Sequence, residues 1–147
     1  MILAGSCGTN PAKQKASWSL QLTTSGGFAG IGNGNLSVDS EGRFKYESPA
    51  RPADVHKGCE GKLTNDQLQL ISDAVEKSDP EHWNRPELNV AAPDAFGYKL
   101  ELRAGSKVKP TTVQWYDNTR DQLPDDLKQL SAALMQIMKT ACRPEAA

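Results

Sequence analysis

The chain has 147 residues, 37% of them apolar, and a formal net charge of −1. This length and apolar content predict one globular domain with a hydrophobic core. Acidic and basic residues are mixed along the chain, without the basic surplus that attracts nucleic acid, so we exclude nucleic acid as a partner. No apolar run approaches the ~20 residues that are needed to span a bilayer.

Residues 1–16 are similar to the end of a bacterial lipoprotein signal followed by a polar spacer. Small and apolar residues precede Ser6 and Cys7, although the charged front of such a signal is missing. We expect either lipidation of Cys7 or a free thiol at this position. Lipidation predicts an exported protein in the periplasm or at the cell surface, which meets a membrane only through its lipid.

The cysteine count also bears on the compartment. If Cys7 is acylated, Cys59 and Cys142 remain and can form a disulfide, as in an exported protein. The alternative is a pair of reduced, buried cysteines in a cytosolic protein. Because the chain has no Cys-x-x-Cys pair and only two histidines, His56 and His82, we predict neither a metal site nor a cofactor.

The first third of the chain reads as strands separated by loops. Ser17–Thr24 alternates apolar and polar residues, which predicts a half-buried strand. The next ten residues, 25–34, include five glycines and form a predicted loop. Asn35–Asp39 and Arg43–Glu47 predict a hairpin, and the prolines of Ser48–Gly61 indicate a long loop after it.

A helix is predicted to follow this long loop. Thr64 and Gln67 have the spacing of a capping box, and apolar residues recur at helical spacing until the helix ends near Ser78. Asp79–Asp94 contains three prolines and several carboxylates. We therefore predict an irregular connection there.

The last part of the chain predicts a second hairpin and a second helix. Ala95–Arg103 alternates, and Val108–Tyr116 should pair with it, with Pro110 confining that strand to an edge or a bulge. Pro124 and the acidic residues after it are typical of a helix start. The helix then carries a broad apolar stripe of Leu127, Leu130, Leu134, Ile137, Met138 and Ala141.

The element order of three strands, a helix, two strands and a helix predicts an α+β fold. We expect two layers, with an antiparallel sheet of about five strands and both helices packed on one face. Residues 17–142 form this single domain, and 143–147 are a tail. The predicted sheet core consists of Trp18, Leu20, Leu22, Leu36, Val38, Phe96, Tyr98, Leu100 and Leu102.

Catalytic patterns are missing from the sequence. The glycines match neither a dinucleotide fingerprint nor a phosphate loop, and there is no Gly-x-Ser-x-Gly or His-Glu-x-x-His. Turn and cap positions account for the acidic residues around Asp117–Asp126. We therefore predict that the protein is not an enzyme. Trp83, Trp115 and Tyr116 fit either an interface or the core.

The glycine-rich segment is the best candidate for a binding site. Phe28 lies between glycine pairs, so the segment offers it little local structure in which to bury its ring. We expect Phe28 to be a contact anchor for a partner and not a core residue.

Four segments together resemble the emfourin family, small bacterial protein inhibitors of thermolysin-like metallopeptidases. They are Ser25–Ile31, Leu63–Gln67, Pro93–Leu100 and Leu123–Leu127. The resemblance spans roughly Ser17–Ile137, and the glycine-phenylalanine motif is its most specific part.

The resemblance implies a protein inhibitor that blocks a metallopeptidase cleft with loop 25–34. The implied contact residues are Ser25, Gly26, Gly27, Phe28, Ala29, Gly30 and Ile31. The alternative is a cell-envelope lipoprotein that binds another protein or a small ligand through its sheet face, without inhibition. That alternative predicts a concave pocket lined by aromatic residues.

Overall fold

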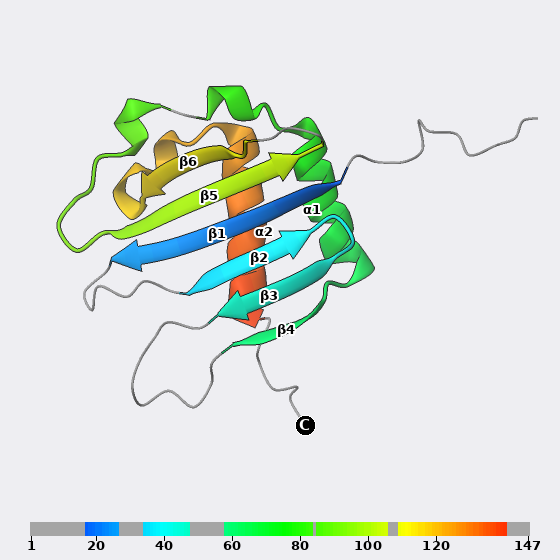
Figure 1. Ribbon diagram of the computed structural model, residues 1–147. Helices are drawn as coiled ribbons and strands as arrows, with labels where there is room; N and C mark the ends of the chain where they lie inside the picture. The colour runs from blue at the N-terminus through cyan, green and yellow to red at the C-terminus, as the bar shows by residue number, and fades with distance from the viewer. Residues whose placement is uncertain (1–16, 27–33, 48–57, 84, 106–108, 141–147) are drawn as a thin grey trace, which may run out of the picture.

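The computed structural model describes residues 17–26, 34–47, 58–83, 85–105 and 109–140. They form one antiparallel sheet with strand order β4-β3-β2-β1-β5-β6, and the two long helices lie on the same face of it (Figure 1). The predicted two-layer α+β fold is confirmed, with six strands where about five were expected.

The strands follow the predicted alternation closely. In β1 the side chains of Trp18, Leu20, Leu22 and Thr24 are buried, while those between them are exposed or half-buried. The six strands are β1 (Trp18–Gly26), β2 (Asn35–Asp39), β3 (Arg43–Glu47), β4 (Cys59–Lys62), β5 (Phe96–Ala104) and β6 (Thr111–Tyr116).

The register of the central strands forms the core. Leu22 of β1 lies opposite Leu36 of β2 and Leu100 of β5. Residues opposite one another in an antiparallel pair point to the same face, so these side chains form one apolar row beneath the helices. All of the predicted core residues are buried there except Phe96, which is partly buried at the edge of the core.

The helices begin where the capping signals predict. In α1 (Asn65–Lys77) the Thr64 hydroxyl accepts from the Gln67 amide at 3.1 Å, and the Gln67 side chain accepts from the Thr64 amide at 2.9 Å. Helix α2 (Asp125–Thr140) follows Pro124, with two carboxylates in its first turn. Its predicted apolar stripe is buried from Leu127 to Met138, Ala141 lies outside the described residues, and the two helices pack against each other.

The predicted irregular connection contains single 3₁₀ turns, η2 (Pro80–His82) and η3 (Pro86–Leu88). Between them Trp83 is fully buried, and its indole N–H donates to Asp126 Oδ2 at 3.0 Å. Trp115 is buried as well. The core interpretation is therefore right for both tryptophans, whereas Tyr116 is only partly buried.

Two sequence boundaries were wrong. The loop predicted over Ser48–Gly61 overlaps the first three residues of β4, which pairs with β3 through Cys59 opposite Tyr46. This strand has no apolar alternation because it lies at the sheet edge with most of its side chains exposed. Strand β6 begins after Pro110, which has no amide to donate to a ladder. After β6 the acidic segment forms a third 3₁₀ turn, η4 (Asp117–Gln122).

Candidate functional site

The glycine-rich segment connects two adjacent strands at one end of the sheet, here called the loop end. Strand β1 reaches this end at Gly26, and β2 begins beside Gly34. Ser25 and Gly26, which were predicted as loop residues, belong to β1 instead and pair with β5. Residues 27–33, including Phe28 and the rest of the predicted contact set, lie outside the described residues.

Two glycines frame this segment, and no other residue fits either position. Gly26 has a φ of +79°, and a Cβ added there would lie 2.5 Å from the Ala95 carbonyl oxygen. Gly34 has a φ of +99°, and its Cβ would lie 2.4 Å from the Glu47 carbonyl oxygen. A positive φ and a backbone collision both exclude side chains, so the backbone is fixed on each side of the segment.

Thr24 joins the two strand ends from which the glycine-rich segment leaves and to which it returns, at Gly26 and Gly34. We call these strand ends the base of the segment. Its buried hydroxyl donates to the Gly34 carbonyl at 2.5 Å, and its amide donates to the Asn35 side chain at 3.3 Å. The hydroxyl occupies a position where the alternation of β1 places an apolar residue. These bonds connect the ends of the glycine-rich segment across the strand pair, so the base is a rigid clamp.

A third glycine shapes the open face beside this base. Ser25, Gly97 and Tyr116 lie opposite one another on β1, β5 and β6. A Cβ on Gly97 would lie 3.0 Å from Ser25 Oγ and 3.1 Å from Tyr116 Cε1. The Tyr116 ring therefore lies over the bare backbone of Gly97, one residue before the last pair of β1 and β5, Gly26 and Phe96. We call these three residues the last row.

The Asp117 carboxylate, which follows Tyr116 in the chain, already accepts hydrogen bonds from within the domain. Asp117 Oδ1 accepts from the Tyr98 hydroxyl at 2.8 Å and from Arg120 Nη2 at 3.0 Å. Its other oxygen accepts from the Phe96 amide at 3.3 Å. Burial, together with the bond to Asp117, raises the pKa of Tyr98 to about 12. Asp117 thus stabilises the end of β5, a role that the assignment of the acidic cluster to turn and cap positions did not include.

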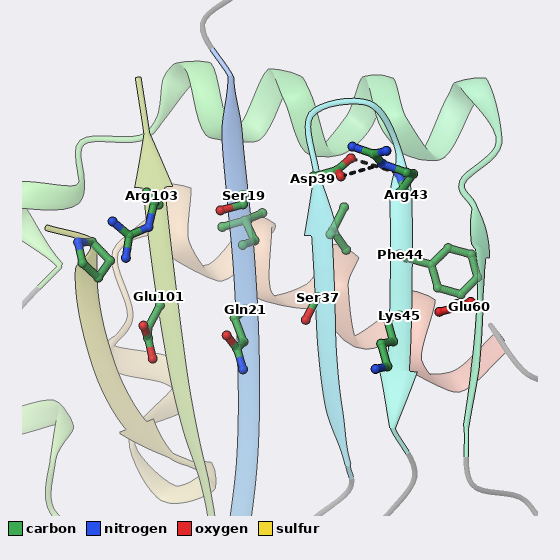
Figure 2. A pocket seen from close by; sticks show the side chains of 13 residues that line it. Ser19, Gln21, Ser37, Asp39, Arg43, Phe44, Lys45, Glu60, Glu101 and Arg103 are labelled. Atoms are coloured by element: carbon green, nitrogen blue, oxygen red, sulfur yellow. Dashed lines mark hydrogen bonds and ion pairs between the residues drawn. The ribbon is translucent and has the colours of Figure 1, made fainter. Parts of the chain in front are cut away.

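The open face of the sheet, away from the helices, carries a polar hollow of about 410 Å³ (Figure 2). Ser19, Gln21 and Ser37 on the two central strands form its floor. Charged side chains of β5 lie on one side of them and those of β3 and β4 on the other. The charged lining residues are Asp39, Arg43, Lys45, Glu60, Glu101 and Arg103.

Several of these charges pair within the sheet. Arg43 Nε lies 3.0 Å from Asp39 Oδ2, and Lys99 Nζ lies 3.7 Å from Glu101 Oε1. Phe44 is the one aromatic residue among the described residues that line the hollow. The lining of the hollow is therefore polar and of mixed charge, unlike the aromatic pocket expected for a ligand-binding sheet face.

The described residues supply little else for chemistry. They contain no group of three or more His, Cys, Asp or Glu side chains placed to hold a metal ion. His82, exposed in η2, lies 2.9 Å from the Asp79 carboxylate, and His56 is outside the described residues. Among the helices in the described ranges, none combines the length and apolar character needed to cross a membrane.

The predicted cysteine chemistry stays a prediction. Cys59 lies in the edge strand β4. Its predicted disulfide partner Cys142 and the predicted lipidation site Cys7 both lie outside the described residues, as do the tail 143–147 and the spacer before residue 17.

The comparisons with known proteins place no constraint on this site. No protein-family model matches the chain, and no curated protein matches it.

Proposed function

We propose that this protein is an inhibitor of a thermolysin-like metallopeptidase and that the glycine-rich loop 25–34 blocks the active-site cleft of the peptidase. The partner is a protein, and the chain supplies no chemistry of its own. We further propose an exported location, periplasmic or at the cell surface, with Cys7 as the lipidation site.

The observation that carries this proposal is the rigid clamp at the loop end. Gly26, Gly34 and the Thr24 hydroxyl fix both sides of the segment on the two most central strands of the sheet. A contact segment on a rigid base loses less conformational entropy when it binds than one on a free chain. An inhibitor that acts by occupying a cleft needs this property more than it needs a catalytic group.

The experiment is a titration of a thermolysin-like metallopeptidase with the purified chain. We expect stoichiometric inhibition by the natural sequence. Phe28→Ala removes the proposed apolar anchor and should weaken the complex by about 2 kcal/mol or more. Leu70→Ala is the matched control, because it truncates a large apolar side chain that is 59% exposed and lies on α1, outside the loop.

Two results would contradict the proposal. One is an absence of inhibition at equimolar concentration with every thermolysin-like peptidase tested. The other is equal inhibition by the natural sequence and by Phe28→Ala, because the loop would then contribute nothing to the contact.

The second candidate is a cell-envelope lipoprotein that binds another protein or a small ligand through the sheet face without inhibiting a peptidase. The hollow gives this candidate a concave surface, but not the aromatic lining that it predicts. Lys45→Glu reverses one charge of the lining and leaves the loop base unchanged. This candidate predicts that Lys45→Glu, and not Phe28→Ala, abolishes capture of the partner. The inhibitor proposal predicts the opposite order.

A further inference from the structure

A groove lies between helix α2 and the edge strand β6, on the helix side of the sheet and away from the hollow. Trp115 of β6, Arg120 of η4 and residues of α2 line it, and its volume is about 290 Å³. We propose that this groove binds a small amphipathic carboxylate, with the carboxylate on the Trp115 indole and the apolar chain along α2. The inference does not depend on the proposed inhibition.

The floor of the groove holds a hydrogen-bond donor without a partner. Trp115 is only 1% exposed, and its ring stacks on Tyr98 with 5.5 Å between the ring centroids. Its indole N–H donates to no group among the described residues, although every fully buried polar side-chain atom there has a partner. The indole nitrogen therefore lies in the small uncovered part of the ring, which faces the groove.

This donor defines half of the ligand. An indole N–H can donate but not accept, so an occupant that satisfies it must present an acceptor. The other fully buried tryptophan, Trp83, donates its indole N–H to the Asp126 carboxylate at 3.0 Å. We expect a carboxylate oxygen of the ligand to fill the same role for Trp115, because hydrogen bonds to a charged acceptor are stronger than those to a neutral one.

The charges around the groove select an anion. Among the described residues that line it, Arg120, Lys128 and Lys139 are cationic and none is acidic. Arg120 is paired with Asp117 at 3.0 Å. Lys128 donates to a backbone carbonyl at 3.4 Å, and Lys139 forms no ion pair with any described residue. The two lysines therefore leave the groove with a net positive charge, which attracts an anion.

The helix supplies the apolar part of the site. Lys128, Ala132, Met135 and Lys139 recur at the spacing of one face of α2, so two apolar side chains lie between the two lysines. A compact anion such as phosphate would leave this stretch uncovered, whereas a carboxylate with an aliphatic chain covers it. The volume lies at the lower end of the range for small-molecule sites, about 300–1,000 Å³, and so favours a short chain.

The test is a titration of the full chain with sodium octanoate, followed through the indole N–H resonances of the three tryptophans in isotope-labelled protein. We expect a saturable shift of the Trp115 resonance, which Trp115→Phe assigns by removing it. The Trp83 resonance should not move, because its indole is already bonded to Asp126. Octanamide has the same chain without the charge and should bind about fivefold more weakly or worse.

Two variants test the chemistry by calorimetry. Trp115→Phe removes the donor and keeps an aromatic ring, and should weaken octanoate binding about tenfold. Lys128→Gln changes only an exposed side chain and should weaken binding about threefold at low salt, and less at high salt. Lys77→Gln is the matched control. Lys77 is an exposed cation in the last turn of α1 that does not line the groove, so its loss should leave binding unchanged.

Three results would overturn the inference. One is that octanoate at millimolar concentration moves no indole resonance, or moves Trp83 as much as Trp115. Another is that octanamide or inorganic phosphate binds as tightly as octanoate. The third is that Lys77→Gln weakens binding as much as Lys128→Gln. The titration contains no peptidase, so its failure leaves the proposed inhibition untouched, and a failure to inhibit leaves this site untouched.

Discussion

The two ends of the central strand pair are built in different ways. At the hairpin end, β2 and β3 are joined by Ser40, Glu41 and Gly42, and Asp39 closes the turn. Its Oδ1 accepts from the amides of Glu41 and Arg43 at 2.9 and 3.1 Å, and its Oδ2 accepts from Arg43 Nε at 3.0 Å. At the loop end, Thr24 and two glycines hold the described residues on either side of the segment.

This difference separates a structural connection from a candidate functional one. The hairpin end satisfies its polar groups within the domain, through Asp39 and through backbone bonds of Ser40 to Trp18 and of Leu63 to Gly42. The loop end uses a buried hydroxyl and two sterically enforced glycines to fix the exit and return of a longer segment. Glycine-rich sequence loses much entropy on ordering, and a fixed base is useful when the segment has a contact to make.

The largest expected effect comes from filling the space at Gly34. Gly34→Ala places a Cβ against the Glu47 carbonyl oxygen at positive φ and should lower the free energy of unfolding by about 3 kcal/mol. Gly105→Ala is the matched control, because Gly105 also has a positive φ, +61°, but nothing lies within 4 Å of its Cβ. Its cost should be about 1 kcal/mol. Chemical denaturation measures both.

Equal losses in the two alanine variants would contradict this account of the loop end. Only the positive sign of φ, which the two sites share, would then matter, and the close approach of Gly34 to the Glu47 carbonyl would not contribute to stability.

A smaller effect is expected from the clamp itself. Thr24→Val keeps the shape of the side chain and leaves the Gly34 carbonyl without its buried donor, which should reduce the free energy of unfolding by about 1 to 2 kcal/mol. Thr23→Val, on the neighbouring half-buried position of the open face, is the control and should change stability by less than about 0.5 kcal/mol. Urea unfolding of both variants tests whether the hydroxyl acts as a clamp.

The smallest effect concerns the hairpin end. Burial raises the pKa of Asp39, but hydrogen bonds from Arg43 and Glu41 outweigh burial and hold it below its ordinary value of 3.8. A carboxyl with a lowered pKa contributes stability above its unfolded pKa and loses it as pH falls through the folded pKa. Between about pH 5 and pH 2, Asp39→Asn should therefore lose less stability than the natural sequence. Thermal melts across this range that run parallel would show that the turn does not depend on the ionised carboxylate.

The sequence predicted those parts of the fold that depend on local periodicity. Alternation located β1 and β5, and the proline with its two acids located the start of α2. Strand β4 was missed because an edge strand with exposed side chains has no apolar period. The sequence could not decide whether Trp83 lies in the core or at an interface. The reason is that its indole bonds to Asp126, which lies 43 positions further along the chain.

The candidate site was predicted only in part, for a related reason. The glycines and Phe28 stand out in the sequence, but the clamp and the last row depend on register between strands. Thr24 could have been noticed, because it carries a hydroxyl at a position of β1 where the alternation predicts an apolar side chain. Nothing local indicates that Gly97 faces Tyr116, because that pairing follows from how β5 and β6 align.

The most direct measurement is amide hydrogen exchange of the full chain. It compares the free protein with the protein saturated with a thermolysin-like metallopeptidase. The account predicts slower exchange in the complex at residues 24–34, with the hairpin end at Asp39–Arg43 unchanged. Protection confined to the hairpin end or to the helices, or no protection at the loop end, would contradict it.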